Sequence, residues 1–200
     1  MKKLVISLLS VLMVLGLMMP VSAESFAVKT VDEFLKAAED PNCTSIVLEN
    51  DLEFTNAKEN QIIVDLTGKT LDLNTKTIKS NHFALIFDGS DFVIKNGNVA
   101  SLNNSSYPLF IGDGPTKNVV VENVVVVNGG INIYNSDNVI LRNTNASTNN
   151  YYAIRSQGST SCTSVQQEII CCSNRIKMVQ KPRKIKVFRG FTVSKRADMV

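Results

Sequence analysis

The chain has 200 residues, of which 44% are hydrophobic, 6% aromatic and 20% charged, and its single histidine is His82. One histidine excludes a multi-histidine metal site within the chain. The formal net charge of +3 averages two unlike parts, because residues 24–154 carry 9 Lys and Arg against 16 Asp and Glu, whereas residues 155–200 carry 10 against 2. The overall charge therefore says little about partners.

Residues 1–23 are predicted to be a secretory signal peptide. Met1-Lys2-Lys3 is a positive start, Leu4–Met19 is an apolar run, and Val21-Ser22-Ala23 is a small-residue cleavage site. The apolar run ends at Pro20 and is short for a membrane span. We expect a bacterial protein that is secreted or displayed on the cell surface, with no membrane span once the signal is removed.

Residues 24–44 are predicted to form an N-terminal cap around the helix Thr30–Ala38. Thr30 and Glu33 have capping-box spacing, and the acidic first turn suits the positive end of the helix dipole. The expected apolar face consists of Val31, Phe34, Leu35 and Ala38. Such a helix is suited to cover the open end of a stack of strands.

A short phrase then recurs along the chain. Its copies are TLDLNTKTI at 70–78, DFVIKNGNV at 91–99, NVVVENVVV at 118–126 and NVILRNTNA at 138–146. With Leu71, Phe92, Val119 and Val139 taken as equivalent, the steps are 21, 27 and 20 residues. Alternating β-branched residues on both sides of a bend predict a stacked repeat of strands.

The sixth residue of each copy marks the bend. These residues are Thr75, Asn96, Asn123 and Asn143. Asn tolerates the left-handed backbone of a tight corner, and its amide can bond an identical amide one layer away. Asn96, Asn123 and Asn143 are therefore predicted to be structural residues of a coil of parallel strands.

Each copy of the phrase is preceded by a leading strand. After a first irregular turn at Ile46–Leu48 and Leu52–Phe54, the predicted leading strands are Ile62–Val64, Phe83–Phe87, Leu109–Ile111, Ile131–Ile133 and Tyr152–Ile154. The coils are predicted to span residues 45–156. The side chains expected to point inward are Val93, Val120, Ile140, Leu85, Ile111 and Ile133.

The pattern stops after Arg155. Residues 157–200 form an irregular basic tail that holds three of the four cysteines. Three interpretations are open: a segment that binds polyanions, a solvated tail, and an out-of-frame end of a longer protein, of which we favour the last. No nucleic acid partner is expected. Cys43 and Cys162 lie at opposite ends of the predicted stack, about 20 Å apart, which is too far for a disulfide unless the tail folds back.

The coil period, the strand-corner-strand unit and the Asn corners resemble the right-handed parallel β-helix superfamily, often called pectin-lyase-like. The resemblance covers residues 45–156 and implies an all-β fold: a short right-handed parallel β-helix solenoid with an N-terminal helical cap and an irregular C-terminal tail. This superfamily includes lyases, hydrolases, tailspikes and adhesins, so the fold alone does not select a function.

The resemblance also implies that a polysaccharide would lie on the outer face of the leading strands. Alternation places Ile86, Phe110, Asn132, Tyr134 and Arg155 on that face. Phe110 and Tyr134 could stack on sugar rings, and Arg155 could hold a carboxylate or a sulfate. The alternative is that these are ordinary residues of a sheet, or that a loop covers them.

Catalysis has weaker support. A lyase of this fold needs clustered acidic residues that bind calcium and a basic residue that takes a proton. The weak candidates for calcium ligands are Asp88, Asp91, Asp113 and Asp137, but Asp is also a common turn residue. The Asn-Thr-Asp, Asp-Asp and Gly-His-Gly motifs of polygalacturonases are missing, and Arg175-Ile176-Lys177 stands without them.

His82 lies in a predicted solvated turn, and Cys43 lacks an evident base, so no catalytic residue is assigned and no cofactor is expected. The favoured function is a surface or carbohydrate-interaction module, either complete or part of a longer protein. One alternative is a polysaccharide lyase or glycoside hydrolase whose catalytic coils are missing or unrecognisable. The other is an adhesin stalk without sugar affinity. The sequence does not predict the oligomeric state.

Overall fold

The structure is a computed structural model that describes residues 24–54, 61–80, 85–102, 107–146, 153–159, 162–165 and 177–178. The predicted signal peptide, His82, the Cys171-Cys172 pair and most of the basic tail lie outside these residues. The described elements are β1 (Glu24–Val28), α2 (Val31–Glu39), β2 (Cys43–Leu48), β3 (Leu52–Phe54), β4 (Ile62–Asp65), β5 (Thr70–Asp72), β6 (Thr77–Ser80), β7 (Leu85–Asp88), β8 (Val93–Ser101), β9 (Leu109–Ile111), β10 (Thr116–Val127), β11 (Ile131–Tyr134), β12 (Ser136–Arg142), β13 (Asn145–Ala146), β14 (Ile154–Gln157), β15 (Cys162–Val165) and β16 (Lys177–Met178).

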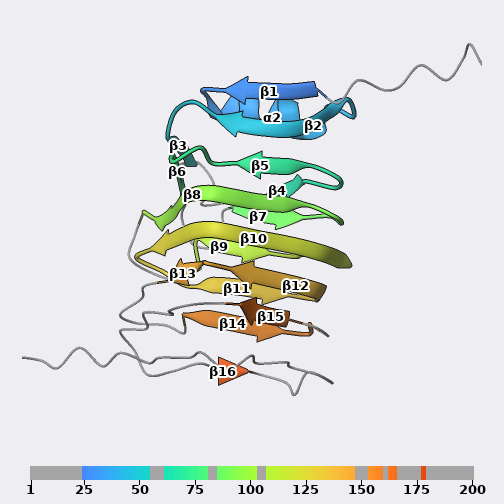
Figure 1. Cartoon of the computed structure of the whole chain (residues 1–200), viewed down its shortest axis with the longest axis vertical. Helices are drawn as coiled ribbons and strands as arrows, with labels where there is room; N and C mark the ends of the chain where they lie inside the picture. Colours follow the sequence, from blue (N-terminus) through green and yellow to red (C-terminus); the bar gives the residue numbers. More distant parts are fainter. Residues whose placement is uncertain are drawn as a thin grey trace, which may run out of the picture.

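These strands form a parallel β-solenoid of about five turns (Figure 1). Sheet A contains the repeated phrases in the order β1-β2-β5-β8-β10-β12-β15, with β3, β6 and β13 joined at its side. Sheet B contains the leading strands in the order β16-β14-β11-β9-β7-β4. From β4 onward the chain alternates between the two sheets, so each coil adds strands to both. The predicted solenoid is confirmed.

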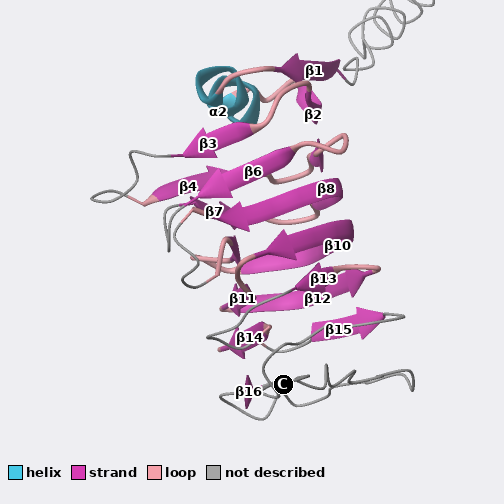
Figure 2. Cartoon of the chain, turned by 90° about the vertical axis from the view of Figure 1, so that its left-hand side faces the viewer, coloured by secondary structure: helices cyan, strands magenta, loops and turns pink. Residues whose placement is uncertain are grey.

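Helix α2 forms where the sequence predicts it and lies at the N-terminal end of the stack (Figure 2). The hydroxyl of its N-cap, Thr30, accepts a hydrogen bond from the Glu33 N–H at 3.2 Å. Phe34 is fully buried, and its ring meets that of Phe54 edge to face at 5.9 Å between centroids. The helix therefore closes the apolar interior of the first coils, as expected.

The register confirms most of the repeat. Val119 pairs with Val139, and it stands opposite Phe92 because the next residue, Val120, pairs with Val93. The predicted equivalence of Leu71 and Phe92 is wrong, because Leu71 pairs with Ile94, 23 residues later. After the corner, Thr77 pairs with Asn98, which is only 21 residues later. The first corner simply contains two more residues than the next one.

The inward side of the phrase strands differs from the prediction. Phe92, Val119 and Val139 are fully buried, whereas Val93, Val120 and Ile140, which were expected inside, are only half-buried on the outer face. Each copy has apolar residues at consecutive positions, so alternation alone does not determine which set faces the core. In the leading strands the prediction is confirmed, because Leu85, Ile111 and Ile133 belong to the hydrophobic core.

Two ladders of side-chain amides run along the stack. In the first, Asn143 donates to Asn123 (2.7 Å), Asn123 to Asn96 (3.3 Å) and Asn96 to the carboxylate of Asp72 (3.3 Å). The second runs in the same way from Asn138 through Asn118 to Asp91. All five asparagines and Asp91 have a positive φ between 44° and 61°. Stacked amides and left-handed corners thus coincide.

The pairing continues past residue 156. Strand β15 pairs with β12 so that Cys162 stands opposite Val139, and β16 pairs with β14. The next phrase strand is therefore in register, although its residues do not repeat the phrase.

Candidate functional site

The leading strands bring one row of side chains together on the outer face of sheet B. Ile63 pairs with Ile86, Ile86 with Phe110, Phe110 with Asn132, and Asn132 with Arg155. Since neighbouring parallel strands lie about 4.8 Å apart, these residues form a continuous row along the stack. Tyr134 points to the same face, two residues after Asn132 on β11. We call these residues the sheet B row.

Most of the row is not open to solvent. Ile86 is 1% exposed, Asn132 3% and Phe110 6%. Sequence alternation identifies the correct face, but Phe110 does not present its ring to solvent in this structure. The accessible members are Tyr134 and Arg155, which are half-buried, and Ile63, which is 49% exposed.

Tyr107 belongs to the site, and sequence reasoning missed it. It is 4% exposed, and the Arg155 guanidinium carbon lies 5.9 Å from the centre of its ring, in cation–π range. Arg155 also donates from Nη2 to Gln157 Oε1 at 2.8 Å. The available signal was an aromatic residue just before β9. The guanidinium is thus fixed between an aromatic ring and an amide.

Asn132 provides the polar centre of the sheet B row. Its Oδ1 is buried and accepts no hydrogen bond from the described part of the chain. Burying an acceptor without a donor costs about 1–3 kcal/mol, and native proteins rarely tolerate this without a reason. Asn132 stands in register between Phe110 and Arg155, so this acceptor belongs to a residue next to a cation.

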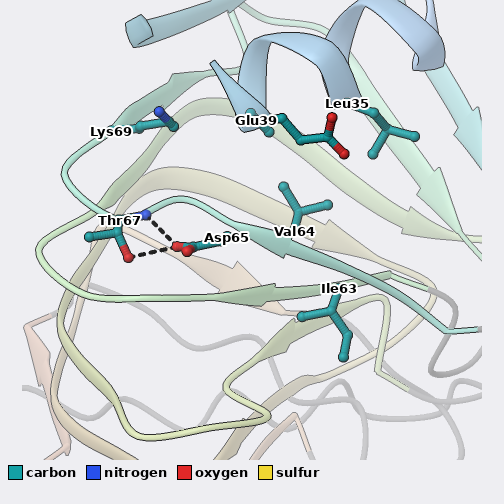
Figure 3. A pocket seen from close by; sticks show the side chains of 8 residues that line it. Leu35, Glu39, Ile63, Val64, Asp65, Thr67 and Lys69 are labelled. Atoms are coloured by element: carbon teal, nitrogen blue, oxygen red, sulfur yellow. Dashed lines mark hydrogen bonds between the residues drawn. The ribbon is translucent and has the colours of Figure 1, made fainter. Parts of the chain in front are cut away.

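A hollow lies between α2 and β4, with a volume of about 390 Å³ (Figure 3). Its lining residues are Leu35, Ala38, Glu39, Ile63, Val64, Asp65, Thr67 and Lys69. Asp65 Oδ1 accepts hydrogen bonds from the backbone N–H of Thr67 (2.8 Å) and from its hydroxyl (2.6 Å). These two bonds organise the turn after β4.

Lys69, which lines this hollow, also contacts Cys43. The buried ammonium of Lys69 donates to the backbone oxygens of Asp40 (2.8 Å) and Cys43 (2.9 Å), so it binds the carbonyls that follow the C-terminus of α2. Burial raises the pKa of the free Cys43 thiol, and the nearby Lys69 ammonium lowers it by less. A thiol held protonated is a poor nucleophile, which gives no support to a catalytic Cys43.

The sequence model of one protein family, described as a pectate lyase-like adhesive domain, matches residues 25–176. The chain belongs to this family. Searches of the curated proteins and of the solved structures found no match. The family and the solenoid together make this chain a β-helix module of an adhesive type.

The matched region of this adhesive domain includes α2, both sheets through β15, and the whole sheet B row. Among the described residues, no helix is long and apolar enough to cross a membrane.

Two of the four aspartates that were weak candidates for calcium ligands accept hydrogen bonds from side chains of this adhesive domain. Asp91 accepts from the Asn118 amide at 2.8 Å, and Asp88 accepts from the Thr116 hydroxyl. Asp137 pairs with Lys117 in the ladder between β10 and β12, and Asp113 is exposed. Within the described ranges no three His, Cys, Asp or Glu side chains gather as a metal site would require.

Proposed function

We propose that this adhesive domain binds an acidic polysaccharide of a cell surface or matrix along the outer face of sheet B. The observation that carries the proposal is the buried Oδ1 of Asn132, which accepts no hydrogen bond from the described residues and belongs to a residue in register with Arg155. Once the side chains that cover Asn132 move aside, a sugar hydroxyl would donate to the amide oxygen, and a neighbouring carboxylate or sulfate would pair with the guanidinium.

The half-buried Tyr134 supports the same interpretation. Its ring lies on β11, on the same face as Asn132, and is partly accessible. An aromatic face next to a polar row is suited to stack on a sugar ring. Phe110, the neighbour of Asn132 within the row, is buried. The proposal includes export of the chain, since such a ligand lies outside the cell.

A glycan array followed by affinity measurements tests the proposal. We expect binding to acidic polysaccharides, a loss of about tenfold or more for Arg155→Gln and for Tyr134→Ala, and near-normal affinity for Tyr134→Phe, which keeps the ring. Arg155→Lys separates charge from shape, because lysine lacks the planar fork of arginine. Unchanged affinity in both Arg155→Gln and Tyr134→Ala would overturn the proposal.

Two other functions have distinct signatures in the same experiment. A stalk without sugar affinity would leave the whole array blank. A lyase or hydrolase would release unsaturated uronates or new reducing ends from a bound polysaccharide, which a colorimetric assay detects.

A further inference from the structure

The outer face of sheet A carries an apolar row that the fold leaves partly exposed. Val93, Val120 and Ile140 are paired in register on β8, β10 and β12, and each is half-buried. Their neighbours in sequence point into the core, so these three side chains point outward. In Figure 1 the strands that carry them lie side by side along the stack. We call these residues the sheet A apolar row.

A charged row runs beside it, two residues further along each strand. Asp72 pairs with Lys95, Lys95 with Glu122, and Glu122 with Arg142. The signs therefore alternate along the stack: negative, positive, negative, positive. Lys95 and Asp72 form an ion pair at 3.6 Å, and Arg142 and Glu122 form one at 3.8 Å. The four side chains keep between 23% and 53% of their surface exposed.

This arrangement is self-complementary under one symmetry operation. A twofold axis parallel to the strands keeps the strand direction and reverses the order of the coils in the second copy. The charged row then faces the charged row of the second copy, and the apolar row faces the apolar row. Asp72 lies opposite Arg142 and Lys95 lies opposite Glu122, and the symmetry forms each of these contacts twice. Sheets packed face to face lie about 10 Å apart, a distance that long charged side chains can bridge.

We propose that a second copy of this chain docks on the outer face of sheet A, antiparallel, as an isologous dimer. The charged row has no net charge, so a uniformly charged polymer would meet as much repulsion as attraction along it. A second copy whose coils ran in the same order along the stack would place like charges opposite each other. The antiparallel copy alone satisfies every position of the charged row and covers the apolar row as well.

Analytical ultracentrifugation of the purified chain over a range of concentrations tests the proposal. Wild-type protein is expected to dimerise reversibly, with a dissociation constant that rises with salt because part of the attraction is between exposed charges. Lys95→Glu and Glu122→Lys each introduce two like-charged pairs into the dimer, so each variant alone is expected to dimerise at least about tenfold more weakly.

Mixing the two variants is the decisive step. In an equimolar mixture each substituted side chain faces an opposite charge on the other copy, so the dimer returns as a heterodimer. Lys36→Glu, the same change on the exposed side of α2, is the matched control and leaves the wild-type dimer intact. Circular dichroism confirms that each variant is folded. If the charge variants fail to fold, Val120→Lys, which buries a charge in the apolar row, is expected to abolish the dimer.

Three results would overturn the proposal. They are a wild-type chain that stays monomeric at every soluble concentration, single variants that dimerise as wild type does, and a mixture that stays monomeric. A Val120→Lys variant that still dimerises would overturn it independently of the charged row.

Discussion

At the scale of single residues, the left-handed asparagines and the buried Asn132 use the same side chain in opposite ways. At the corners, Asn123 donates to Asn96 and accepts from Asn143, so its amide is paired in both directions. In the sheet B row, the Oδ1 of Asn132 is left without a donor from the described residues. A paired amide stabilises the stack, whereas a buried acceptor without a donor opposes folding.

Asn132→Leu tests this difference between fold and function. Replacing the orphan acceptor by an apolar side chain of similar size removes a desolvation cost, so we expect the free energy of unfolding to rise by about 1 kcal/mol or more. The affinity for the acidic polysaccharide is expected to fall at the same time. Urea denaturation and the glycan assay measure the two effects. A variant that is both less stable and normal in binding would show that Asn132 has only a structural role.

At the scale of elements, each phrase strand has two apolar faces, and only one of them faces the core. Val119 is fully buried and its neighbour Val120 is half-buried, although the two residues are identical in type and share strand β10. Packing against sheet B and the adjacent coils selects the inner set. The outer set forms the sheet A apolar row.

Val119→Ala and Val120→Ala form a matched pair that measures this selection. We expect Val119→Ala to cost about 2–3 kcal/mol of unfolding free energy, because it removes two buried methyl groups and leaves a cavity. Val120→Ala, on the outer face, is expected to cost less than about 1 kcal/mol in the monomer. Denaturant curves at low protein concentration avoid any contribution from the dimer. Equal losses would contradict the register.

At the scale of the whole molecule, a solenoid is stabilised by contacts between neighbouring coils, so its ends decide where unfolding begins. At the N-terminal end, α2 covers the interior, and Lys69 ties the carbonyls after its C-terminus to the turn before β5. This one buried ammonium connects the cap to the coils.

Lys69→Met tests the connection. Methionine keeps the length and apolar character of the side chain but leaves two carbonyl oxygens without their charged donor, so we expect a loss of about 2–3 kcal/mol. The rate of amide hydrogen exchange should increase more in α2 and β2 than in β10 and β12. The pKa of Cys43 should rise further, because the nearby positive charge that lowers it is gone. Uniform acceleration along the stack would show that the cap is not a separate unit.

Much of this protein follows from the sequence because it depends on local preferences that repeat. Each of the signals that predicted the solenoid, its corners and its helix lies within a few consecutive residues. These signals are asparagine in left-handed corners, β-branched strands at a regular spacing and a capping box at Thr30. In the leading strands the residues expected inside, Leu85, Ile111 and Ile133, do belong to the core, although most of these strands are apolar at consecutive positions.

Only the tertiary structure decided which face of each phrase strand is buried, because residues such as Val119 and Val120 differ in position and not in type. It also decided that Phe110 and Asn132 are covered and that Tyr107 lies under Arg155, since these contacts join segments whose spacing carries no local signal. The alternating charges of sheet A became a surface through the strand register, which brings Asp72, Lys95, Glu122 and Arg142 into one row. Register depends on how the coils pack, and no single phrase of the sequence contains it.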